Sequence, residues 1–134
     1  MTLSERTNRP LAAAAVILIL TAGAHAFMGG PEINAVVQQS ALDPVVRSVS
    51  AVVWHALTVL FLIMGAAAFW AARRTNMALV VMLGAICFSF VAVFLVIGLT
   101  ALGTIWLMPQ WIFFVVAGAL LLWGLRGKTD AAFA

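Results

Sequence analysis

The sequence predicts an all-α integral membrane protein: a four-helix bundle of up-down-up-down topology with a short amphipathic helix on its outer side. Three features predict it, namely the composition, four apolar runs and the placement of the basic residues. Of the 134 residues, 66% are hydrophobic and only 8% are charged, whereas a soluble globular domain is about 45–50% apolar and about 25% charged. This small number of charges cannot solvate the surface of a soluble protein. We therefore predict a single membrane domain over residues 1–134.

Four apolar runs are long enough, or nearly so, for a helix that crosses about 30 Å of hydrocarbon, which takes about 20 residues. They cover approximately residues 11–28, 45–72, 77–101 and 105–125. The start of the fourth run depends on Pro109. We expect Thr104 to cap a helix that Pro109 then bends, because residues 105–107 (IWL) would otherwise form an apolar loop. The alternative is a shorter span with Pro109 at its first position.

The segment between the first two spans predicts the amphipathic outer helix. Pro31 and Glu32 suit a first helical turn, and apolar residues then recur at helical spacing: Ile33, Val36, Val37 and Ala41. Such a helix would lie on the outer membrane face. Asp43 and Pro44 follow as an N-cap and first position for the second span, which would begin slightly outside the membrane.

The basic residues predict the orientation. Six of the seven fall on one side of the predicted membrane: Arg6, Arg9, Arg73, Arg74, Arg126 and Lys128. Only Arg47 falls on the other side, so the positive-inside rule places both termini in the cytoplasm of a bacterial inner-membrane protein. The five tryptophans lie near the two predicted boundaries, as in an aromatic belt: Trp54, Trp106 and Trp111 on the outer side, Trp70 and Trp123 on the inner. The pI near 10.6 therefore reflects topology, and no nucleic-acid partner is expected.

A second interpretation of the N-terminal region stays open. Arg6 and Arg9, a short apolar stretch and residues 24–26 (AHA) also fit a signal peptide with an A-x-A cleavage site. Cleavage there would leave three spans and a chain that begins at Phe27.

Few residues could carry catalysis. Cys87 is the single cysteine, so no intramolecular disulfide or CxxC pair can form. No Asp, Glu, Lys or Arg lies within the membrane-crossing part of a predicted span, and the GxxxxGKS, GxSxG and HExxH motifs are missing. We therefore predict no catalytic residue.

The two histidines are the candidate site. His25 lies 16 residues after Arg9, and His55 lies 18 before Arg73, so both are roughly 24–27 Å from the cytoplasmic boundary. If spans one and two are neighbours, the two imidazoles can meet near the outer interface. Thr21 and Thr58 lie about one turn away, where each hydroxyl could bond its imidazole or a nearby carbonyl.

Three hypotheses fit this pair. The imidazoles could simply hold the helices together by hydrogen bonds. They could ligate a tetrapyrrole such as haem b, with His25, His55, Thr21 and Thr58 around it. They could form a metal or quinone site with Glu32.

Two resemblances accompany these hypotheses. Residues 51–55 (AVVWH) resemble the Ala-x-x-x-His element that places bacteriochlorophyll in light-harvesting helices, although Thr21 stands where His25 would need the alanine. The four-span layout is similar to that of many small bacterial membrane proteins, including the DoxX-like group.

The leading functional hypothesis is an accessory or assembly subunit of a larger membrane complex, respiratory or photosynthetic. Its expected partners are lipids and that complex or further copies of itself. The alternatives are a tetrapyrrole-binding electron-transfer protein and a small oligomeric channel or carrier.

Overall fold

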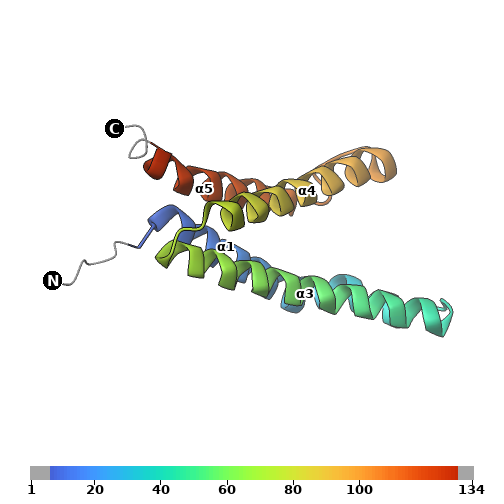
Figure 1. Cartoon of the computed structure of the whole chain (residues 1–134). Helices are drawn as coiled ribbons and strands as arrows, with labels where there is room; N and C mark the ends of the chain where they lie inside the picture. The colour runs from blue at the N-terminus through green and yellow to red at the C-terminus, as the bar shows by residue number, and fades with distance from the viewer. Residues whose placement is uncertain (1–6, 130–134) are drawn as a thin grey trace.

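A computed structural model describes residues 7–129, and no strand occurs among them. In chain order the elements are α1 (Arg9–Ala24), the π-helix η1 (His25–Asn34), α2 (Ala35–Gln38), α3 (Pro44–Arg73), α4 (Met77–Leu102) and α5 (Trp111–Thr129). The four long helices run alternately in opposite directions (Figure 1). The all-α prediction is therefore confirmed for the described part of the chain.

The four helices form two hairpins rather than a closed bundle. α1 packs against α3, α4 packs against α5, and α1 also contacts α5, but contacts between α3 and α4 are few. The start of α1, the end of α5 and the α3–α4 connection lie at one end of the molecule, and from there the hairpins diverge (Figure 1). The result is a V that opens at the opposite end.

Three helical stretches are long and apolar enough to cross a membrane, which suggests a membrane protein. They are Arg9–Gln38 and Pro44–Arg73, of 30 residues each, and Met77–Leu102, of 26. The apolar part of α5, Trp111–Arg126, is shorter.

The separate amphipathic helix expected between the first two spans is wrong. η1 and α2 continue α1 without a break as far as Gln38. Pro31 lies inside this stretch, where it lacks an N–H and its ring would clash with the carbonyl four residues earlier in an α-helix. The π-helix takes bonds five residues back, as in Ala35 N–H to Gly30 O, and this wider turn accommodates the proline. The expected start of α3 is confirmed, because Asp43 Oδ1 accepts from Val45 N–H at 2.8 Å and Pro44 is the first helical residue.

The expected start of the fourth helix near residue 105 is also wrong, because α5 begins at Trp111. Gly103 ends α4 in the left-handed conformation, at φ 67°, which glycine adopts without steric cost. The chain then folds back on α4, where Thr104 N–H donates to Gly98 O at 3.1 Å. The Trp111 indole N–H holds the loop by donating to Ile105 O at 3.2 Å. Residues 105–107 are thus the apolar loop that the sequence argued against, and neither proposed role of Pro109 is realised.

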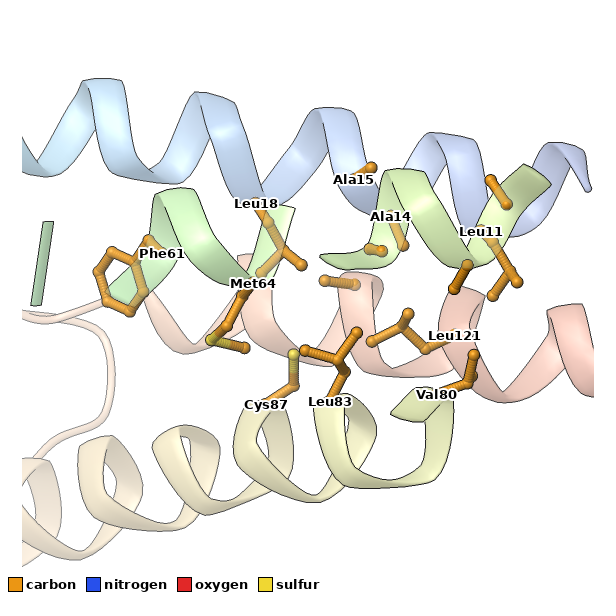
Figure 2. Packing of buried hydrophobic residues seen from close by; sticks show 14 of the residues in the cluster. Leu11, Ala14, Ala15, Leu18, Phe61, Met64, Val80, Leu83, Cys87 and Leu121 are labelled. Carbon is orange, nitrogen blue, oxygen red and sulfur yellow. The ribbon is translucent and has the colours of Figure 1, made fainter. Parts of the chain in front are cut away.

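The core lies where the two hairpins meet near the closed end of the V. Figure 2 shows Leu11, Leu18, Met64, Leu83 and Leu121 pointing toward one another from four helices. Small residues on α1 and α3 let the two backbones approach closely: Ala14, Ala15, Gly65 and Ala68. Cys87 is fully buried among these side chains, which fits a packing residue.

Asn8 joins three helices at the closed end, a role the sequence did not indicate. Its backbone N–H donates to Ala72 O at 2.8 Å and its side-chain Nδ2 donates to Gly124 O at 2.8 Å. Its Oδ1 accepts from Leu11 N–H at 3.3 Å and so caps α1. This one residue therefore holds α1 to both α3 and α5.

We expect Asn8→Ala to lower the free energy of unfolding by about 1–3 kcal/mol, because it removes a helix cap and an interhelical bond together. Asn8→Ser is the matched control, since it keeps a capping oxygen but cannot reach Gly124 O, and it should cost less than alanine. Unfolding in mixed detergent followed by circular dichroism measures both. Equal stability of all three proteins would contradict this role.

Candidate functional site

His25 is the first residue of η1 and faces α3. Its Nε2 lies 3.1 Å from Trp54 O; a carbonyl oxygen only accepts, so Nε2 is the protonated nitrogen. Its ring stacks on the Trp54 indole, with centroids 4.0 Å apart and planes 18° apart, and meets Phe61 edge-on at 5.6 Å. His25 thus fastens η1 to α3 by a hydrogen bond and two ring contacts.

The two threonines bond backbone carbonyls rather than the imidazoles. Thr21 Oγ1 donates to Ile17 O at 2.8 Å, within its own helix. Thr58 Oγ1 donates to Trp54 O at 3.3 Å, the oxygen that His25 also uses. The sequence left open whether each hydroxyl bonds an imidazole or a nearby carbonyl, and in the structure both bond a carbonyl.

His55 does not meet His25. Successive residues of a helix point about 100° apart, so Trp54 faces His25 and His55 turns aside. The His55 side chain is exposed, and within residues 7–129 the structure gives it neither a hydrogen bond nor a ring contact. The predicted encounter of the two imidazoles is therefore replaced by a contact between His25 and Trp54.

Glu32 is exposed on η1 and does not join either histidine. Among residues 7–129, no group of three or more His, Cys, Asp or Glu side chains is placed to hold a metal ion. The structure therefore does not bring His25, His55 and Glu32 together as one set of ligands.

A bis-imidazole haem site needs a free ring nitrogen from each histidine. In this arrangement His25 Nε2 donates to Trp54 O, which leaves Nδ1 as its unprotonated nitrogen. The His25 ring is stacked on Trp54 while His55 turns aside, so the two imidazoles do not face one iron. The residues present do not fit a haem held by both histidines. Ligation of a tetrapyrrole by His55 alone stays a prediction.

A groove lies between the η1–α2 arm and α3, with His55 in its wall. Its volume is about 370 Å³, and it is open to the outside of the molecule. Ala26, Gly30, Pro31, Asn34 and Ala35 line it from one arm; Trp54, His55 and Thr58 line it from α3. Because most residues on the η1–α2 side are small, space remains between two helices that are otherwise in contact.

A pair of reciprocal bonds closes the hairpin above the groove. Arg47 Nη1 donates to Gln38 O at 2.9 Å, and Gln38 Nε2 donates to Arg47 O at 3.0 Å and to Asn34 Oδ1 at 3.3 Å. From the sequence, Arg47 was interpreted only as the one basic residue on the outer side, and these bonds were not predicted. Gln38 is the last residue of α2 and Arg47 lies in the first turn of α3, so both flank the same short turn, which is the signal that could have paired them.

The function of this site has to be inferred from its own geometry, because comparison with known proteins found no match. No family model, curated protein or solved structure matches the chain.

Proposed function

We propose that the chain is a small helical subunit of the bacterial inner membrane, with both termini in the cytoplasm, that packs against a larger membrane complex through the outer end of its α1–α3 hairpin. One observation carries the proposal. This hairpin is longer than a membrane is thick, and its excess length carries exposed apolar side chains.

The excess follows from helix geometry. Each arm of the hairpin has 30 residues, about 45 Å at 1.5 Å per residue, against about 30 Å of hydrocarbon. If the basic end of each arm lies at the cytoplasmic boundary, about 20 residues cross the membrane and about ten project beyond it. The projecting part is residues 29–53, which we call the hairpin tip.

The hairpin tip is apolar where it faces outward. Eight of its large apolar side chains are 49–69% exposed: Ile33, Val36, Leu42, Val45, Val46, Val49, Val52 and Val53. Lipid tails do not reach beyond the hydrocarbon region, and exposed apolar patches outside it mark interaction surfaces. A partner protein that covers the hairpin tip would remove this surface from water.

The proposed orientation is supported by where the chain places its basic residues. The start of α1, the α3–α4 connection and the end of α5 all lie at the closed end of the V (Figure 1). Arg9, Arg73, Arg74 and Arg126 belong to these three places. Arg6 lies outside the described residues. A basic end of this kind stays in the cytoplasm under the positive-inside rule.

Cysteine cross-linking in native membranes tests the proposal. In a Cys87→Ala background we would place single cysteines at Val45 and Val49 of the hairpin tip and at Ile63, which is 58% exposed but lies within the predicted span. With a photo-activated maleimide, the two tip positions should give one discrete adduct and the Ile63 position none. If no partner covers the hairpin tip, its two cysteines stay exposed to water. Complete labelling of both by a membrane-impermeant maleimide, together with no cross-linked adduct, would therefore overturn the proposal.

The Val49 cysteine and a further single cysteine at Thr75 test the orientation. An impermeant maleimide added to intact spheroplasts after disruption of the complex should label the cysteine at Val49, while one at Thr75 in the α3–α4 connection should react only after lysis. The reverse pattern would place the termini outside.

A further inference from the structure

The groove beside His55 holds two hydrogen-bond donors that have no partner within residues 7–129. Asn34 Oδ1 accepts from Gln38, but in this part of the chain no acceptor is bonded to Asn34 Nδ2. His55 likewise has no hydrogen bond there, and each tautomer of its ring carries an N–H. Thr58 already donates to Trp54 O. Beside the accepting nitrogen of His55, the groove therefore offers two donors that are not yet bonded, and these suit a ligand that carries acceptors.

The ligand that suits this groove is uncharged. None of the eight lining residues is Asp, Glu, Lys or Arg. The nearest cation along α3, Arg47, lies two turns away and donates to Gln38 O. Phosphate or carboxylate groups bind where Arg, Lys or several N–H groups converge, and the eight lining residues form no such cluster.

The shape of the groove favours a flat ring. One wall is the Trp54 side chain, which His25 holds in place by stacking and which packs close to Gly29. The opposite wall is made of small residues of η1. The volume of about 370 Å³ lies at the small end of ligand sites, which are mostly apolar with a few placed polar groups.

The height of the groove favours a ligand that arrives through lipid. His55 lies 18 residues before Arg73, about 27 Å along the helix, and so close to the outer edge of an about 30 Å hydrocarbon layer. A ring bound there can keep an apolar tail in the membrane. π-Helical turns such as the one that lines this groove are frequent at functional sites.

We propose that the groove between η1 and α3 binds the head group of a quinone, an uncharged planar ring with two carbonyl acceptors, through His55 N–H and Asn34 Nδ2, with Trp54 against the ring. The proposal concerns binding alone. It rests on the membrane placement proposed above but does not need the partner complex, because the groove lies between two arms of one chain.

The two histidines allow a direct test by NMR. In protein labelled with ¹³C-histidine, titration with decylubiquinone should shift the His55 ring signals saturably and leave the His25 signals nearly unchanged. His55→Ala and Asn34→Leu should each weaken binding about three- to tenfold, the range expected for one lost hydrogen bond. Ser48→Ala is the matched control, since Ser48 is an exposed α3 residue outside the groove, and it should bind like the unmodified protein.

A second probe distinguishes recognition of the carbonyls from general affinity for an apolar chain. Decylbenzene has a ring and tail of the same kind without the acceptors, and it should not produce the saturable His55 shift. The proposal fails if decylbenzene binds as well as decylubiquinone. It also fails if the shifts grow linearly with quinone in every variant, as partition into detergent would give. His55 is exposed and has no hydrogen-bond partner in the described part of the chain, so the folding of His55→Ala, checked by circular dichroism, should be unaffected.

Discussion

Replacing Gly65 by valine is expected to separate α1 from α3 and to lower the free energy of unfolding by about 1–3 kcal/mol, the usual cost of overpacking a core. A Cβ at this position would lie 2.6 Å from Ile19 Cγ1 and 3.3 Å from Ala15 O. Ile19 is β-branched and has one strongly preferred rotamer in a helix, and the carbonyl belongs to the backbone. The helices themselves must therefore move apart.

Gly23→Val is the matched control, because nothing lies within 4 Å of a Cβ built at Gly23. Both variants replace a helical glycine in the same hairpin by the same side chain, so changes in helix propensity largely cancel. Unfolding in mixed detergent followed by circular dichroism gives both free energies. If Gly23→Val is destabilised as much as Gly65→Val, the close approach of α1 and α3 at Gly65 is not what stabilises the hairpin.

We expect Phe114→Ala to loosen the junction between the two hairpins. Phe114 of α5 is 2% exposed. Its ring centroid lies 5.4 Å from that of Phe61 on α3, and 4.9 Å and 6.0 Å from those of Phe90 and Phe94 on α4. These rings are the main aromatic contact across the V, where α3 and α4 otherwise touch little.

The expected cost of Phe114→Ala is about 2–3 kcal/mol. In soluble proteins Phe→Ala costs about 3–5 kcal/mol, which includes the transfer of the ring to water. In a bilayer that transfer term is largely absent, because lipid is as apolar as the protein interior, and lost packing remains.

Phe113→Ala is the control, since the neighbouring ring is 50% exposed and its removal should change stability by less than about 0.5 kcal/mol. Spin labels at the open ends of α3 and α4 add a second measurement. Their distance distribution should broaden in Phe114→Ala only. Equal effects of both substitutions would mean that the aromatic cluster does not set the geometry of the V.

Helix ends were predicted well where a local signal marks them. Asp43 and Pro44 predicted the start of α3, and the paired arginines its end near Arg73. The start of α5 was not predicted correctly, because residues 105–107 are apolar and an apolar run favours a helix. What holds them as a loop is the hydrogen bond from the Trp111 indole N–H to Ile105 O, a contact that the local pattern does not indicate.

In the candidate site, too, one property was predictable from the sequence and another depended on tertiary contacts. Counting residues from the basic ends placed His25 and His55 at similar depth, and the structure puts His25 against Trp54, one residue from His55. Depth follows from the fixed rise of a helix. Which of two consecutive residues faces the partner depends on how each helix is rotated about its axis, and only packing fixes that rotation.

By itself the sequence determined the all-helical class, the long apolar stretches and the grouping of basic residues at the start of α1, the α3–α4 connection and the end of α5, because these follow from composition, hydrophobic length and local pattern. The tertiary structure alone decided that α1 continues through a π-helix past Pro31, that His25 bonds Trp54 while His55 lines a groove, and that the hairpins open into a V. The last two depend on contacts between residues distant in the chain, where small side chains let α1 and α3 approach and the Phe61–Phe114 ring contact joins the two hairpins.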